Sequence, residues 1–263
     1  MMTVGKLARI YARDVLRSRW ILVYAGFFLL LSEGLLRFSG SDSKAILGLG
    51  SVMLMLVPLV ALVLATVYVY GAREFVETLL AQPIRRRALF TGLYCGLAFP
   101  MAGAFVVGVG IPLVVRGLGD DGVRGASLTL LAAGVLLTLS FVAIGCCVAL
   151  AIEDRLRGLT AALGVWFVLA VLYDGLVLTL VTTFADRPLE KPLLALTFAN
   201  PIDLARVLLL LRLDVAALMG YTGAAFQHFF AGATGGALAV GALAVWTVVP
   251  VIAGARQFRL KDF

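Results

Sequence analysis

The chain has 263 residues, of which 62% are hydrophobic and only 14% are charged. Soluble domains average about 45–50% apolar and about 25% charged residues, so the composition excludes an ordinary soluble protein and indicates a polytopic membrane protein. The formal net charge of +7 does not indicate a nucleic-acid partner, because the basic residues flank apolar runs and act as topology signals.

Residues 1–19 are predicted to form an amphipathic helix in the plane of the membrane, because apolar residues share one face and arginines lie largely opposite. Six apolar runs follow, each near the ~20 residues that cross a bilayer. Pro58 is expected to kink the second run, and Pro100 and Pro112 to break up the third. The expected membrane helices cover residues 20–38, 46–70, 93–115, 127–151, 159–184 and 235–255. The fold class is therefore an all-α polytopic membrane protein with one permease domain over residues 1–263.

The distribution of basic residues predicts the orientation of these helices. Six crossings place both termini on one side, and that side carries 14 Lys and Arg residues against 8 on the other. Because basic residues are enriched on the cytoplasmic side, both termini are predicted to be cytoplasmic, in a bacterial inner membrane.

The loop over residues 72–92 is predicted to be a cytoplasmic coupling element. Its first half has the pattern of a short amphipathic helix that ends before Pro83, since proline lacks an amide donor and disfavours helix at the preceding residue. Arg85–Arg87 follow and mark the cytoplasmic side. The apolar face suits a groove in a soluble partner, and it equally suits lipid headgroups. That face comprises Phe75, Val76, Leu79 and Leu80, and the candidate coupling residues are Glu74, Phe75, Glu77, Leu79 and Leu80.

The segment over residues 185–234 is predicted to cap the bundle from the periplasmic side. Asn200 and Pro201 form a strong helix start, with Asn as the N-cap and Pro in the first turn. Apolar residues then recur at helical spacing, so we expect amphipathic or re-entrant helices at the outer leaflet; a surface hairpin without a special role is the alternative. The candidate periplasmic docking residues are Asn200, Asp203, Arg206, Arg212 and Tyr221.

Two acids lie inside the expected membrane helices, where charge is costly and usually marks function or a buried partner. Glu33 and Asp174 should sit at similar depth in the outer half of the bilayer, where they could line one polar vestibule. Glu33 has a simpler explanation, because Arg37 follows one turn later and can pair with it. Asp174 has no basic neighbour at helical spacing, which leaves function or an interhelical hydrogen bond.

The sequence contains no catalytic or metal-binding pattern. It has no GxxxxGK[ST] loop, HExxH or GxSxG motif, and its only histidine is His228. Met53, Met55 and the three cysteines suggest Cu(I) only weakly, because residues two apart on a helix do not face one another. We therefore expect no enzyme activity, no metal site and no cofactor in this chain, with any ATP bound by a separate subunit.

Several segments resemble the permease subunits of type-2 ABC exporters. They are the basic amphipathic N-terminus, ETLLAQPIRRRALFTGLY (Glu77–Tyr94) and the closing FRLKDF (Phe258–Phe263). Two further segments, Asp154–Asp174 and Phe198–Phe226, are similar to a narrower group of permeases, which serve the maturation of the copper sites of nitrous oxide reductase.

This resemblance implies a homodimer in the lipid bilayer, a cytoplasmic NosF-like ABC ATPase and a periplasmic NosD-like β-helix protein. It also implies a role in copper delivery or gating, or in the transfer of mechanical work, in denitrification. Two other functions stay open: a type-2 exporter of a small molecule or sulfur species, and a passive membrane anchor or assembly factor.

Overall fold

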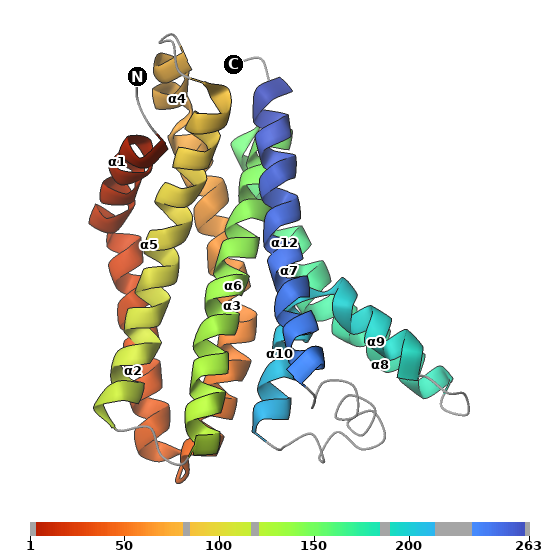
Figure 1. Cartoon of the computed structure of the whole chain (residues 1–263). Coiled ribbons are helices and arrows are strands. Elements are labelled where there is room, and N and C mark those ends of the chain that lie inside the picture. Colours follow the sequence, from red (N-terminus) through yellow and green to blue (C-terminus); the bar gives the residue numbers. More distant parts are fainter. Residues whose placement is uncertain (1–3, 81–84, 117–120, 185–189, 214–232, 261–263) are drawn as a thin grey trace.

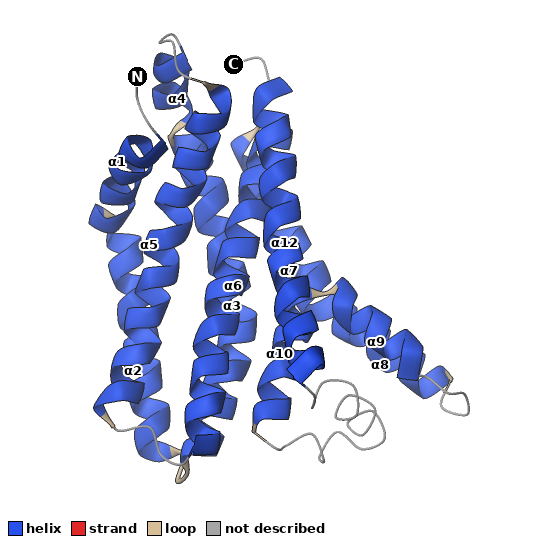
Figure 2. Cartoon of the chain, in the orientation of Figure 1, coloured by secondary structure: helices blue, strands red, loops and turns tan. Residues whose placement is uncertain are grey.

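The computed structural model describes residues 4–80, 85–116, 121–184, 190–213 and 233–260, and every regular element among them is helical (Figure 2). Among these described residues, six helical spans are long and apolar enough to cross a membrane. The all-α polytopic fold is therefore confirmed. Residues 214–232, which include Tyr221 and His228, lie outside the described residues.

The spans are longer than the sequence pattern indicated. The third and fourth, for example, were expected to begin at residues 93 and 127 but begin at Arg86 and Asp121. A helix of 30 residues is about 45 Å long at 1.5 Å per residue, so these helices extend beyond about 30 Å of hydrocarbon. The spans are α2 (Arg19–Phe38), α3 (Asp42–Gly71), α5 (Arg86–Val115), α6 (Asp121–Ala151), α7 to α8 (Arg155–Thr183) and α12 (Ala233–Leu260).

The expectation that prolines break up the third span is wrong. Helix α5 runs without interruption through Pro100 and Pro112. Transmembrane helices tolerate proline because packing neighbours and local adjustment satisfy the freed carbonyl groups. The second half of the expected 72–92 loop is also helical, because α5 begins at Arg86.

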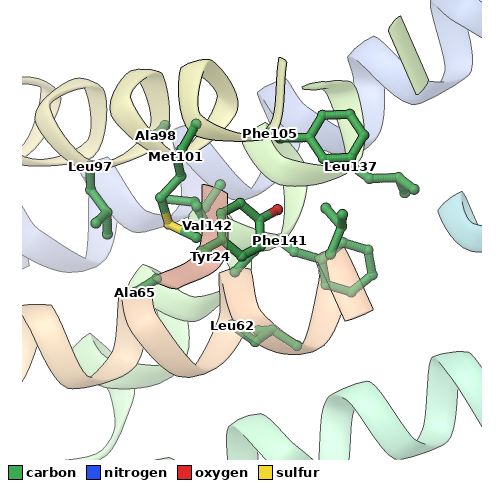
Figure 3. Close-up of a cluster of buried hydrophobic side chains, with 14 of the residues drawn as sticks. Tyr24, Leu62, Ala65, Leu97, Ala98, Met101, Phe105, Leu137, Phe141 and Val142 are labelled. Carbon is green, nitrogen blue, oxygen red and sulfur yellow. The ribbon is translucent and has the colours of Figure 1, made fainter. Parts of the chain in front are cut away.

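Helices α3, α5 and α6 form the packed centre of the bundle, with half or more of the most apolar 18-residue stretch of each helix buried. Only 6% of the span from α7 to α8 and 11% of α12 are buried. Figure 3 shows the centre, where Tyr24 of α2, Leu62 of α3, Met101 of α5 and Phe141 of α6 meet. The outer spans therefore rest on a well-packed inner group.

Glycines on α5 allow the N-terminal helices to approach its backbone closely. A Cβ at Gly108 would lie 2.7 Å from the Ala25 carbonyl oxygen of α2, and one at Gly96 would lie 2.3 Å from the Tyr11 Cβ. Tyr11 belongs to α1 (Val4–Arg17), whose buried face packs on α5. Burial in this contact raises the pKa of the Tyr11 hydroxyl to about 12. Helix α1 thus packs on the bundle and does not lie free on lipid.

Both termini lie at the same end of the bundle, as the six crossings require (Figure 1). At the other end, α9 (Glu190–Ala199) and α10 (Pro201–Arg212) form a pair bent by 113°. The Asn200 side chain accepts a hydrogen bond from the Ile202 amide, which confirms the expected N-cap. Figure 1 shows α8 and α9 leaning away from the bundle together while α10 returns to it. A hydrogen bond from the Tyr173 hydroxyl to the Leu196 carbonyl joins α8 to α9.

Candidate functional site

The short helix α4 (Arg73–Leu80) lies at the end of the bundle that holds both termini (Figure 1). Its first residue, Arg73, donates hydrogen bonds to the carbonyls of Glu153 at 2.8 Å, Ile152 at 3.1 Å and Ala149 at 3.3 Å. These carbonyls belong to the C-terminal end of α6 and the turn after it, where helical carbonyls have no intrahelical donor and the helix dipole favours a cation. One guanidinium therefore fastens α4 to the end of α6.

Tyr70, the last aromatic residue of α3, strengthens the same junction. Its hydroxyl donates to the Ile152 carbonyl at 2.8 Å, and the Arg73 guanidinium lies 4.6 Å from its ring centroid. A Cβ at Gly158 of α7 would overlap the Tyr70 hydroxyl, so a larger residue there would displace the Tyr70 ring. The ends of α3 and α6 and the starts of α4 and α7 thus meet at one point.

The apolar face of α4 is turned toward the bundle. Val76 is 3% exposed and Leu79 is 5% exposed, while Leu80 is half-buried. Phe75 is partly exposed, and its ring meets the edge of Tyr11 at 5.8 Å between centroids. The expectation that Leu79 inserts into a partner's groove is therefore wrong, because the helix uses this residue to dock on its own chain.

The outward face of α4 is polar. Glu74, Glu77 and Thr78 are exposed, and the Thr78 hydroxyl donates to the Glu74 carbonyl. The two acids and the edge of Phe75 form the surface that α4 offers to solvent, and we call these three residues the coupling face.

A second polar cluster lies toward the other end of the bundle, between α8 and α10. Arg206 of α10 binds Asp174 of α8 through two parallel hydrogen bonds, both of 2.9 Å. The same guanidinium lies 3.0 Å from Asp203, which is only 13% exposed. We call Asp174, Arg206 and Asp203 the ion cluster. Two-point pairing of this kind fixes both distance and orientation, so it ties α10 firmly to α8.

The ion cluster corrects the expected role of Arg206. This residue was a candidate for docking a periplasmic protein, but its guanidinium is turned to Asp174 and Asp203 within the chain. Arg212, at the end of α10, remains exposed. Asp174 was expected to have either a function or an interhelical hydrogen bond. The structure shows the hydrogen bond, and its partner lies 32 residues away in the sequence.

The other intramembrane acid does not join this cluster. Glu33 of α2 pairs with Arg37 one turn later, which confirms its simpler explanation. The two acids therefore belong to separate ion pairs on different helices. Met53 is buried and Met55 exposed, so these two sulfurs also face different ways.

Asn200 couples the ion cluster to an irregular turn in the fifth span. Residues Val168–Leu172 form a π turn, in which the Tyr173 amide bonds to the Val168 carbonyl five residues back. The Leu169 carbonyl, which this amide would reach in an α-helix, accepts a hydrogen bond from the Asn200 side chain at 2.8 Å. The side-chain nitrogen of Asn200 also donates to the Asp203 carboxylate, at 3.3 Å. Asn200 is thus more than a helix cap, because it also satisfies the π turn.

Sequence reasoning missed the junction at Arg73 and the π turn. The role of Arg73 could have been predicted, since a basic side chain near the C-terminal end of a helix often donates hydrogen bonds to the last carbonyls. A π turn has no comparable pattern in a run such as VLAVL, because its signal is a distant partner for a freed carbonyl.

Replacing Arg73 with alanine should destabilise the chain. The change leaves three carbonyls without their charged donor, and hydrogen bonds to charged groups are worth about 1.5–3 kcal/mol each at most. The thermal unfolding midpoint of the purified protein in mild detergent should fall by several degrees. Arg157→Ala, an exposed arginine nearby on α7, is the matched control and should leave the midpoint unchanged. Equal midpoints for both variants would contradict the role of this junction.

Replacing Arg206 with alanine should loosen α10, because Asp174 and Asp203 are then two carboxylates without the cation between them. The double variant Arg206→Ala, Asp174→Asn should regain part of the loss, with a coupling of about 0.5–3 kcal/mol between the two sites. Thermal unfolding of the single and double variants measures this coupling. Arg212→Ala should be neutral; if it is as harmful as Arg206→Ala, the ion cluster is not what holds α10.

Comparison with known proteins agrees with this architecture. The family model described as ABC-2 family transporter protein matches residues 6–263. A probable ABC transporter permease protein NosY from Pseudomonas aeruginosa is 29% identical, over 97% of this chain and 95% of that protein. A second, from Stutzerimonas stutzeri, is 26% identical over 79% of this chain and 81% of that protein. The chain therefore belongs to the ABC-2 transporter family, as a permease subunit similar to NosY.

Proposed function

We propose that this permease relays ATP-driven motion from a separate cytoplasmic ABC ATPase to a periplasmic partner. The chain has no nucleotide-binding loop of its own, so the ATPase is a separate NosF-like subunit that holds the ATP. The end with α4 and both termini is the cytoplasmic one, since it carries 14 of the 22 Lys and Arg residues. The coupling face of Glu74, Phe75 and Glu77 is then directed toward the ATPase.

The observation that carries this proposal is one helical span that is fastened near its start and again from its middle onward. Near the α4 end, Arg73 holds the turn that leads into α7, and Gly158 of α7 packs under Tyr70. Toward the other end, Arg206 and Asn200 hold α8 and the π turn. The span from α7 to α8 has 29 residues, so a displacement of α4 can reach α10 through it.

Packing favours movement of this span over movement of its neighbours. In its most apolar stretch of 18 residues only 6% is buried, compared with 61% in the corresponding stretch of α5. A lightly packed helix moves against a well-packed group at smaller cost, because fewer apolar contacts change. The π turn adds a point at which the hydrogen-bond ladder is already interrupted.

The exposed apolar surface of this span and of α12 suits lipid and a second copy of the chain, and we propose a homodimer in the inner membrane. The resemblance to NosY extends the proposal to a NosD-like periplasmic β-helix protein and to maturation of the copper sites of nitrous oxide reductase. Among the docking candidates that the structure describes, Arg212 stays exposed and is the one proposed to meet the periplasmic partner, because Arg206 is engaged within the chain.

Reversing the charge of the coupling face tests the proposal. The double variant Glu74→Lys, Glu77→Lys should reduce capture of the co-expressed ABC ATPase by about tenfold or more, because like charges opposed at an interface cost several kcal/mol. Tagged permease is purified in mild detergent, and the bound ATPase is quantified. Both changed side chains are exposed, so folding should be unaffected.

Asp42→Lys, an exposed acid at the opposite end of the bundle, is the control and should capture the ATPase fully. Full capture by the double variant would show that α4 is not the main contact. Absence of any ATPase from the unaltered complex would favour a passive membrane anchor.

A further inference from the structure

A cavity of about 320 Å³ lies between α3, α8 and α10 and is bordered by the ion cluster. Small-molecule sites occupy about 300–1,000 Å³, so this cavity is large enough for a small organic ligand. It opens beside Ser51 and Met55, which are exposed on α3. Most of its wall is apolar and includes Ile46, Leu54, Ile202, Leu209 and Leu213.

The ion cluster that borders the cavity carries a net negative charge, and Asp174 is the carboxylate of the cluster that lines the cavity. Asp174 and Arg206 line the cavity, and Asp203 is the third member of the cluster, so two carboxylates share one guanidinium. Arg206 directs both terminal nitrogens to these carboxylates. The Asp174 side chain is nevertheless 41% exposed, which leaves carboxylate lone pairs open to a ligand.

The remaining polar groups of the cavity also accept hydrogen bonds. The Ser51 hydroxyl donates its proton to the Leu47 carbonyl at 3.0 Å, so only its lone pairs are available. The Met55 sulfur is a weak acceptor. An anion would meet a guanidinium that two carboxylates already share, whereas a cation with several N–H groups would meet acceptors and an opposite charge.

We propose that this cavity binds a primary ammonium group carried on a small apolar body. An ammonium supplies three donors, which Asp174 and the Ser51 hydroxyl can accept, while the apolar walls cover the body. The ammonium can belong to a soluble amine or to the headgroup of an aminophospholipid that enters from the lipid side. This site goes beyond the proposed relay and requires no ATPase.

The test compares two probes, 2-phenylethylamine and 2-phenylethanol. They share one apolar body and differ in the terminal group, which is a charged ammonium in the first and a neutral hydroxyl in the second. The full chain is placed in nanodiscs of phosphatidylcholine and phosphatidylglycerol, and binding of each probe is measured by titration calorimetry. The amine should bind about tenfold or more tightly than the alcohol, because its hydrogen bonds to the cavity are charge-assisted. Equal binding of the two probes, or no saturable binding of the amine, would overturn the proposal.

Two variants locate the binding. Asp174→Asn removes the excess negative charge and should weaken amine binding by about tenfold, with the alcohol unaffected. Ser51→Phe fills the mouth of the cavity without touching the ion cluster, and it should abolish binding of both probes. Ser51→Phe therefore tests whether the probes bind in this cavity even if Asp174→Asn does not fold. Glu33→Gln changes the acid of the other ion pair and is the control, so it should leave amine binding unchanged. Amine binding that survives Ser51→Phe would place the site elsewhere.

A change of lipid separates the two sources of the ammonium group. If an aminophospholipid is the occupant, nanodiscs that contain phosphatidylethanolamine should weaken apparent binding of the amine to the unaltered chain. If the occupant is a soluble amine, the affinity should be the same in both lipid mixtures.

Discussion

Hydrocarbon offers no hydrogen-bond partner, so a polar group buried in a membrane bundle is stabilised when it finds one within the protein. That constraint explains the positions of its most informative side chains. Arg73 serves the carbonyls at the end of α6, Asn200 serves the carbonyl released by the π turn, and Arg206 neutralises Asp174. Each of these contacts joins segments that lie far apart in the sequence. The polar groups of the bundle are therefore also the points at which its helices are fastened together.

Packing divides the bundle into a densely packed part and a lightly packed part. Close packing at Gly96 and Gly108 brings α1 and α2 onto α5, and aromatic rings fill the space between α3, α5 and α6. The span from α7 to α8 has few buried residues, and polar contacts at Trp166, Leu169 and Asp174 join it to α3 and α10. A permease that transmits movement needs this combination, because a moving element requires a fixed frame to move against.

The sequence was sufficient for the membrane spans, the shared side of the termini and the Asn200 cap, because these follow from local patterns of apolar residues and helix signals. It was misleading for α4, where periodicity identified the apolar face but not its direction; Leu79 packs inward. It also assigned Arg206 to a partner protein, because nothing local shows that Asp174 lies opposite. Contacts between distant segments depend on how the helices pack, and one sequence read by local pattern does not contain that information.

The central claim is that the α7–α8 span moves relative to α3 when the ATPase binds ATP. Spin labels at Ser43→Cys on α3 and Thr183→Cys on α8 measure this distance by electron paramagnetic resonance, with one labelled protomer in each permease–ATPase complex and the native cysteines replaced. The reference pair, Ser43→Cys with Gly122→Cys on α6, spans two helices of the packed centre. The account predicts that ATP changes the first distance by several ångströms and leaves the second unchanged. An unchanged first distance in the ATP-bound complex would contradict it.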